Sequence, residues 1–188
     1  GIDLPNKTFS KNIHAVSKIL TITNFTHYDK ARGLVPLIEA IEKLRTTHPK
    51  LSLTVVGGGK HLDTFRSQYK KDYIKFVGFQ KNVLSYIDDN DIFVHSTFLD
   101  NFPYTILEAS ANKIATIAVN VGAIPEMLPS TSIVSPTSRS IENLLHQLLS
   151  STPLMSQVTA DNYECIQKFS WLNVVRKFTN VYNDSYDN

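Results

Sequence analysis

Short apolar runs alternate along the chain with longer segments in which apolar residues recur every three or four positions. The apolar runs predict strands at residues 18–24, 51–56, 74–79, 91–96, 115–120 and 131–135. Helical spacing is clearest between the first two runs, where one face carries Leu34, Leu37, Ile38, Ile41 and Leu44. Weaker helical segments are predicted at residues 61–71, 82–90, 98–110 and 123–128.

The predicted strands are continuous apolar runs, which is typical of a parallel sheet covered by helices on both faces. Beyond residue 139 the pattern is helical, with apolar stripes in residues 140–151 and 170–182. Ser170 is placed to cap the second of these helices. We therefore expect an α/β fold: a doubly wound, Rossmann-like parallel sheet of about six strands, with helices on both faces and a helical C-terminal trailer.

The composition fits a globular protein with a substantial core. Of 188 residues, 42% are hydrophobic and 19% are charged, and the formal net charge of +2 is too small to indicate a nucleic acid partner. The one cysteine, Cys165 in a predicted helix at 162–169, cannot form an internal disulfide and favours a reducing compartment. We predict no signal peptide and no membrane span, and expect a cytoplasmic protein that can associate peripherally with the inner face of the membrane.

Ligands of open parallel sheets bind beyond the carboxyl ends of the strands, where loops meet helix N-termini. Here those loops carry two cations, Lys30 and Arg32, and the helix near Pro103 is flanked by two acids, Asp100 and Glu108. Helix N-termini suit phosphate oxygens, and a carboxylate can bind both hydroxyls of a ribose. The pattern thus favours a phosphorylated sugar ligand. Taken singly, Asp100 could instead cap the helix, and Glu108 could be a solvated surface residue.

Other familiar motifs are weak or missing. Residues 57–59 are three glycines after the second strand, but the sequence lacks the third glycine of a dinucleotide fingerprint and its later acidic residue. The glycines indicate a tight turn or a close approach of backbone to ligand. The six histidines show no metal-ligand spacing, and His95 stands out among them because it ends the fourth strand.

The order of the segments resembles the C-terminal, donor-binding half of retaining glycosyltransferases of family 4, which have the two-domain GT-B architecture. The family's motif of an acid, seven residues and a glutamate stands here as D-N-F-P-Y-T-I-L-E-A, from Asp100 to Ala109. Residues 120–128 (N-V-G-A-I-P-E-M-L) resemble the family's glycine-rich turn, and residues 74–96 resemble the stretch around its nucleobase pocket. Residues 1–3 resemble the linker between the halves, and residues 169–171 resemble the entry to the C-terminal helix.

The resemblance implies a role for each candidate residue. Asp100 would lie by the hexose and phosphates of the donor, Glu108 would bind the ribose hydroxyls, and Lys30 and Arg32 would stabilise the departing diphosphate without a metal. The remaining donor-binding residues are those that would hold the pyrophosphate (Asn101, Phe102, Pro103, Tyr104 and Thr105), those that would flank the base (Gly78, Phe79 and Val83), and Gly57 and Asn24 in the loops beside them. No separate cofactor is expected.

The sequence departs from the family pattern at three positions. Asp100 replaces the usual glutamate, and Asn101 replaces a glycine, which is tolerable because asparagine accepts positive φ better than most residues. Thr23-Asn24 stands where the family has Gly-Arg, so the expected arginine is missing. Arg32, before Gly33, can stand for the family lysine, and Lys30 can supply the second charge.

The resemblance also implies how the chain is organised. Residues 1–16 would be a remnant of the inter-domain linker, residues 17–188 would bind the nucleotide sugar, and the N-terminal acceptor domain would be absent. We expect a hexosyltransferase that moves a hexose from a UDP-, GDP- or ADP-sugar, with retention, to a glycan, a lipid-linked acceptor or a polysaccharide. The isolated domain would be inactive. The alternative is a non-catalytic nucleotide-binding or assembly module on a degenerate glycosyltransferase fold.

Overall fold

The computed structural model describes residues 1–5 and 17–186, which contain one sheet of six parallel strands in the order β3-β2-β1-β4-β5-β6. The strands are β1 (Lys18–Ile22), β2 (Ser52–Val56), β3 (Ile74–Gly78), β4 (Ile92–His95), β5 (Ala115–Val119) and β6 (Ile133–Val134). The predicted α/β fold with six parallel strands is thereby confirmed. Most of the linker predicted at residues 1–16 lies outside the described residues.

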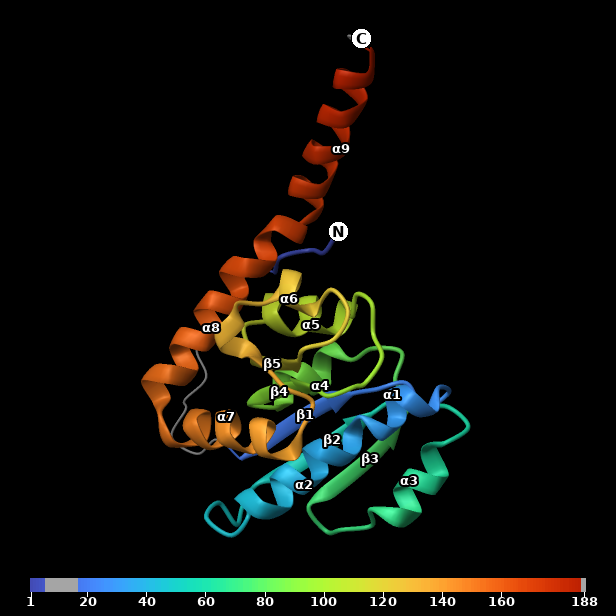
Figure 1. Ribbon diagram of the computed structural model, residues 1–188, viewed down its shortest axis with the longest axis vertical. Coiled ribbons are helices and arrows are strands. Elements are labelled where there is room, and N and C mark those ends of the chain that lie inside the picture. The colour runs from blue at the N-terminus through green and yellow to red at the C-terminus, as the bar shows by residue number, and fades with distance from the viewer. Residues whose placement is uncertain (6–16, 187–188) are drawn as a thin grey trace.

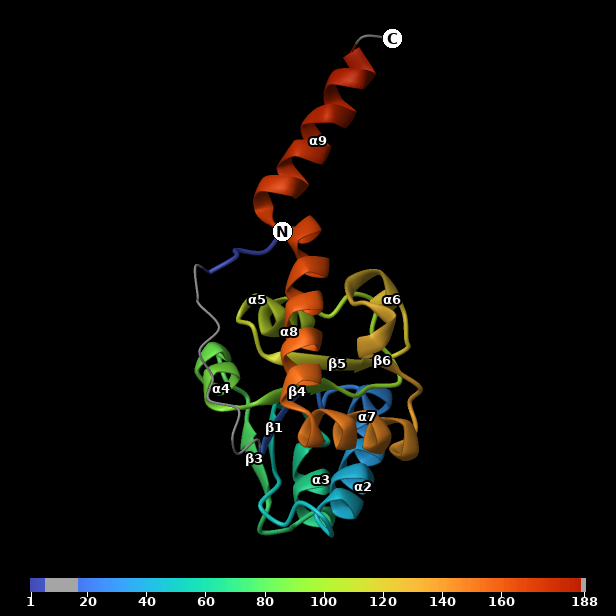
Figure 2. The same cartoon turned by 90° about the vertical axis from the view of Figure 1, so that its left-hand side faces the viewer.

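Helices cover both faces of the sheet (Figures 1 and 2). One core contains residues of α1 (Tyr28–Arg32), α2 (Leu34–Leu44), α3 (Leu62–Gln68) and α7 (Ser138–Ser150). The opposite core contains residues of α4 (Leu84–Asp89), α5 (Tyr104–Ala111) and α6 (Ile124–Met127). The helix α8 (Thr152–Ile166) contributes to both cores, because it runs past the sheet and packs against β5 and α5.

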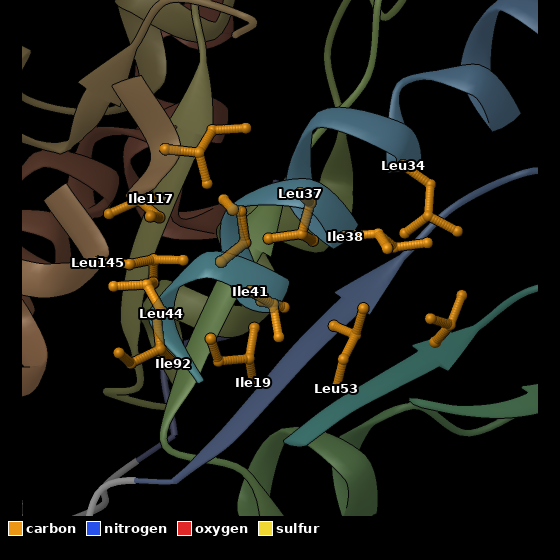
Figure 3. Close-up of a cluster of buried hydrophobic side chains, with 14 of the residues drawn as sticks. Ile19, Leu34, Leu37, Ile38, Ile41, Leu44, Leu53, Ile92, Ile117 and Leu145 are labelled. Carbon is orange, nitrogen blue, oxygen red and sulfur yellow. The ribbon is translucent and has the colours of Figure 1, made fainter. Parts of the chain in front are cut away.

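Neighbouring residues of one strand serve opposite cores, and this explains the continuous apolar runs. In β1, Ile19 belongs to the core under α2 and Leu20 to the core under α5; Ile92 and Phe93 of β4 divide in the same way. Figure 3 shows the predicted stripe of α2 lying over the sheet, with its side chains directed at residues of β1, β2, β4 and β5. Because both faces are covered, most positions of these central strands are apolar.

Two helices differ from the expectation. The helix α1 falls in a segment that we expect to be a loop. The helix α8 begins at Thr152, ten residues before the helix predicted at 162–169. The end of that predicted helix is the 3-10 turn η3 (Gln167–Phe169). A second 3-10 turn, η2 (Ser130–Ser132), precedes β6. The start of α8 is set by Ser151, whose hydroxyl accepts the N–H of Leu154 at 3.3 Å. Polar buried residues interrupt the apolar stripe of α8, which explains why the pattern missed it.

The last helix, α9 (Trp171–Tyr186), projects from the body in both views (Figures 1 and 2). Ser170 caps it as predicted, since its hydroxyl accepts the N–H of Asn173 at 3.4 Å, and Ile2 forms a parallel bridge with Ser170. Most of the predicted apolar stripe is exposed: Trp171, Val175, Phe178, Val181 and Tyr182 are more than half accessible, as is Leu172 beside them, whereas Val174 is half-buried. No helix among the described residues combines the length and apolarity needed to cross a membrane.

Candidate functional site

The site lies where the strand order reverses. From β1 the chain continues to β2 on one side, whereas β4 lies on the other side, so the loops leaving β1 and β4 diverge and open a crevice at their carboxyl ends. A cavity of about 430 Å³ occupies this position. Ten of the predicted site residues line it: Asn24, Lys30, Gly57, Phe79, Val83, Asp100, Phe102, Pro103, Tyr104 and Thr105.

Asp100 is the charged centre of this cavity. Its Oδ2 atom accepts a hydrogen bond from Nζ of Lys30 at 3.1 Å and lies 3.5 Å from Nε2 of His95. The Asp100 and Lys30 side chains are 17% and 26% exposed, so this ion pair is less screened by solvent than a surface pair. An ammonium group from α1 and an imidazole from β4 therefore both approach one carboxylate oxygen in the loop after β4.

The carboxyl of Asp100 is held in its charged form. Burial by itself would raise the pKa of Asp100, but the contacts with His95 and Lys30 outweigh burial and hold that pKa below its ordinary value. Asp100 does not cap α5, because the N-cap residue is Pro103 and no side chain caps that helix. The helix-capping alternative for Asp100 is therefore wrong.

The loop that carries Asp100 is backed by the turn after β5. Gly122 has a φ of +54°, and a Cβ atom at this position would lie 2.0 Å from the carbonyl oxygen of Asp100. The next residue, Ala123, donates its N–H to the carbonyl of Asn101 at 3.0 Å. The glycine-rich turn seen in the sequence thus supports the acid loop by allowing close contact between two backbones.

The glycines after β2 serve a similar purpose on the other side of the cavity. A Cβ atom on Gly57 would lie 1.8 Å from the carbonyl oxygen of Thr23, so the loops after β1 and β2 touch through their backbones. The N–H of Phe25 donates to the carbonyl of Gly58 at 3.0 Å. The predicted close approach therefore involves two protein segments, and Gly57 and Gly58 also line the cavity.

The first turn of α5 lines the same cavity as Lys30. Pro103 has no N–H group, and among the described residues the amides of Tyr104 and Thr105 find no acceptor. These two N–H groups lie at the positive end of an eight-residue helix, and Tyr104, Thr105 and Lys30 line the same cavity. Together they form a surface suited to the oxygens of a phosphate or diphosphate.

Glu108 lies in a second cavity of about 500 Å³ next to the first, and Val83 lines both. The second cavity is closed on one side by the N-terminal residues Ile2, Asp3 and Pro5. Burial raises the pKa of Glu108, and its carboxyl is partly shielded from solvent. Glu108 is therefore only partly solvated, and its surroundings penalise its charge.

Three predicted residues lie beside the first cavity. Arg32 does not line the first cavity: it pairs with Asp29 at 2.8 Å and lies over the ring of Phe98, 4.9 Å from its centroid, and its side chain is half exposed. Gly78 ends β3, one residue before Phe79. Asn101 lines a small neighbouring cavity of about 220 Å³ that it shares with Lys30 and Asp100.

Two of the three residues expected to flank a base, Phe79 and Val83, line the first cavity with apolar side chains. Phe79 is 77% exposed at the mouth of the first cavity, and Val83 follows at the start of α4. Tyr104 on the opposite side is 57% exposed. An aromatic ring held open to solvent on a short loop is available for contact with a planar ligand group.

His95 was not predicted among the site residues, although its position at the end of β4 was noted. The structure places its side chain in the cavity lining with 5% exposure. Thr23, Gln80 and Thr97 also line the cavity and were not predicted. Each directly follows a strand or stands one residue further on, so the rule that ligands bind at the carboxyl ends of strands could have found them. Within the described residues, no three His, Cys, Asp or Glu side chains are grouped to hold a metal ion.

The family model described as glycosyl transferases group 1 matches residues 6–164 of the chain. This range includes every element from β1 to the C-terminal part of α8, and thus both cavities except for the residues that precede position 6.

Curated relatives match most of the chain at low identity. The gpi3 subunit of a phosphatidylinositol N-acetylglucosaminyltransferase of Schizosaccharomyces pombe is 24% identical over 195 residues, which cover 96% of this chain and 42% of that protein. A phosphatidylinositol N-acetylglucosaminyltransferase subunit of Homo sapiens is 26% identical over 178 residues, covering 87% of this chain and 36% of that protein. The chain therefore spans about two fifths of the length of these relatives.

Solved structures share the fold. The C-terminal domain of a glycosyl transferase group 1 family protein from Francisella tularensis has a TM-score of 0.70 and 24% identity, covering 83% of this chain and 89% of that domain. An Anabaena protein in complex with UDP and glucose has a TM-score of 0.76 and 14% identity, covering 92% of this chain and 49% of that protein.

Proposed function

The chain belongs to the glycosyl transferases group 1 family, and on this basis we propose that it is the donor-binding part of a hexosyltransferase. In this proposal the whole enzyme transfers a hexose from a nucleoside diphosphate sugar to an acceptor with retention. The observation that carries the proposal is the Lys30–Asp100 pair, 3.1 Å long, beside the free first-turn amides of α5 in a cavity at the switch point of the sheet.

The geometry supports one arrangement of the donor. The diphosphate lies against Lys30 and the amides of Tyr104 and Thr105, with the backbone of Asn101 to Pro103 beneath it. Phe79 contacts the base, and Gly78 and Val83 complete that side. The ribose reaches Glu108 past Val83, which lines both cavities. Asp100 and Asn24 are left for the hexose, and Gly57 closes the floor.

The chemistry follows from where charge develops. When the bond to the sugar breaks, the leaving diphosphate gains negative charge, and Lys30 with the two amides of α5 is already placed to stabilise it. We propose that these groups do so without a metal ion and that no separate cofactor is used. Arg32 pairs with Asp29 outside the cavity, so Lys30 is assigned the role that the sequence divided between the two residues.

The relatives favour a particular donor and acceptor. The fission yeast and human relatives are both called phosphatidylinositol N-acetylglucosaminyltransferase subunits, and the Anabaena structure contains UDP. We therefore propose a UDP-linked N-acetylhexosamine as donor and a lipid-linked acceptor. Such an acceptor fits a cytoplasmic enzyme at the inner face of a membrane, and an acceptor-binding domain or subunit completes the cleft.

Nucleotide binding by the chain is the direct test. Isothermal titration calorimetry with UDP, GDP and ADP should give binding at millimolar concentration or better for at least one of them. Lys30→Met should weaken that binding about tenfold or more, because a charge-assisted hydrogen bond to phosphate is lost. Arg32→Met is the matched comparison and should weaken binding less, since Arg32 lies outside the cavity. No binding of any nucleotide would refute the proposal.

A second titration examines the ribose site. Glu108→Ala should weaken all three nucleotides by a similar factor and leave their order of affinity unchanged, because the ribose is common to them. Unchanged affinity would remove Glu108 from the site.

A second candidate function is a non-catalytic nucleotide-binding or assembly module. It is favoured by Asn24, which lines the cavity at the position where the resemblance expects an arginine. As a result, Lys30 is the one lysine or arginine among the described residues that line the cavity. The discriminating experiment measures transfer from UDP-N-acetylglucosamine with an acceptor-binding domain joined to this chain. Transfer would eliminate the module, whereas nucleotide binding without transfer would favour it.

A further inference from the structure

Two side chains contact the same oxygen atom of Asp100. Nζ of Lys30 lies 3.1 Å from Oδ2 and donates a hydrogen bond, whereas Nε2 of His95 lies 3.5 Å from the same atom and forms no hydrogen bond. Lys30 is the more exposed of the two partners, and His95 is almost fully buried. Asp100 thus has one hydrogen-bonded partner, Lys30, and one partner without a hydrogen bond, His95, and both line the cavity.

The imidazole of His95 is unusual among the buried polar groups. Neither of its ring nitrogens has a hydrogen-bond partner among the described residues, and both nitrogens are inaccessible to solvent. Buried polar atoms in folded proteins are nearly always paired, and an unpaired one calls for a specific explanation. Because its nitrogens are covered, His95 cannot contact a ligand without rearrangement, but Asp100 is within reach.

We propose that His95 is a positioning residue that takes over the carboxylate of Asp100 when a nucleoside diphosphate draws Lys30 away. This inference rests on the proposed function, because it requires that Lys30 bind the diphosphate. In the structure Lys30 donates to Asp100, so a diphosphate that binds the ammonium group competes with Asp100 for it. Oδ2 then needs to move only about 0.7 Å toward Nε2 to reach a charge-assisted hydrogen bond of about 2.8 Å.

The surroundings favour such a transfer. The pKa of Asp100 lies below its ordinary value, against the effect of burial, so the carboxylate stays charged and a partly buried charge without a partner is unfavourable. The acid loop is anchored by Gly122 and by the bond from Ala123 to Asn101, which limits movement of the backbone. Besides Lys30, His95 and Asp100, Tyr104 is the remaining titratable side chain among the described residues that line the cavity.

A double-mutant cycle with UDP as the probe tests the transfer. Calorimetry on the chain compares His95→Phe in the natural background with His95→Phe combined with Asp100→Ala. In the natural background the substitution should weaken UDP binding about tenfold, because Asp100 then has no second partner and stays on Lys30. In the Asp100→Ala background Lys30 is already free, so the same substitution should change the affinity by less than about twofold.

Two further variants keep the test independent of folding. His95→Gln can still donate to Asp100 and should restore most of the affinity, and His95→Leu replaces His95→Phe if the larger ring prevents folding. An equal loss in both backgrounds would show a merely structural role and overturn the inference. UDP binding that is unchanged by His95→Phe would also overturn it while leaving the proposed function intact, whereas absence of UDP, GDP and ADP binding in the natural chain would remove both.

Discussion

The support that Gly122 gives to the acid loop leads to a quantitative prediction about Gly122→Ala. The added Cβ would meet the carbonyl oxygen of Asp100 at 2.0 Å and Cα of Asn101 at 3.2 Å. Since such contacts do not occur below about 3.0 Å, the loop must retreat by about 1 Å. That movement breaks the hydrogen bond from Ala123 to Asn101, which is 3.0 Å long.

Gly78 is a matched control because its φ is also positive, at +80°, and yet no atom lies within 4 Å of the position of an added Cβ. An alanine in this conformation costs about 1–2 kcal/mol, offset by about 0.4–1 kcal/mol from the stiffer unfolded chain, so Gly78→Ala should cost about 1 kcal/mol. Gly122→Ala adds about 1 kcal/mol for the hydrogen bond and about 1–2 kcal/mol of packing strain, which brings its cost to about 3–4 kcal/mol.

The assay is urea unfolding followed by circular dichroism, which yields the free energy of unfolding of each variant. We expect Gly122→Ala to lie about 2–3 kcal/mol below Gly78→Ala, and UDP binding to weaken with it, because the same loop carries Asp100 and leads into α5. Equal free energies of unfolding would show that the close contact between the two backbones is not what requires glycine at this position.

Four further substitutions probe other features. Glu108→Gln should raise the free energy of unfolding at pH 7, because burial raises the pKa of Glu108; the gain should vanish as the pH falls through that native pKa to the unfolded one. Asp100→Asn should lower the free energy of unfolding at pH 7, because the pKa of Asp100 is lower in the native state than in the unfolded state. The loss should disappear as the pH falls from the unfolded pKa through the native pKa. Urea titrations between about pH 3 and pH 7 check the sign for both variants. Lys113→Gly should raise the free energy of unfolding by about 0.5–1 kcal/mol, because Lys113 has a φ of +56°; a loss would mean that its side-chain contacts outweigh the backbone strain. Asn162→Ala should lower it by about 2–3 kcal/mol, since the buried amide donates to the carbonyl of Thr116 at 2.7 Å and accepts from a serine hydroxyl; a loss below about 0.5 kcal/mol would contradict this.

The central strands could be predicted because burial on two faces leaves a simple pattern in the sequence. A run such as residues 91–96 needs no tertiary information, since every position of β4 is buried. The helix α8 was found only in part, because its buried face includes Thr159 and Asn162, whose polar groups are satisfied by contacts that the sequence does not reveal. The helix α1 has five residues and one buried side chain, too few for a periodic signal.

The candidate site divides in the same way. The sequence alone singled out Asp100, Glu108 and Lys30 as candidates, because residue type and position after a strand are local properties. It could not separate Lys30 from Arg32, which are two positions apart and point in different directions on a helix. Nor could it assign His95, whose significance depends on how the loop after β4 turns back to bring Asp100 within 3.5 Å of its ring.

The sequence by itself determined which segments form the sheet and its covering helices, and which end of the sheet carries the polar groups, because these depend on hydrophobic periodicity and chain direction. Only the tertiary structure decided which side chains share the cavity, which cation pairs with Asp100, and that Glu108 occupies a separate hollow. Those outcomes depend on distances of a few ångströms, mostly between segments far apart along the chain. The order of the strands and the rotation of the helices set these distances, and the local hydrophobic pattern of the sequence carries no information about them.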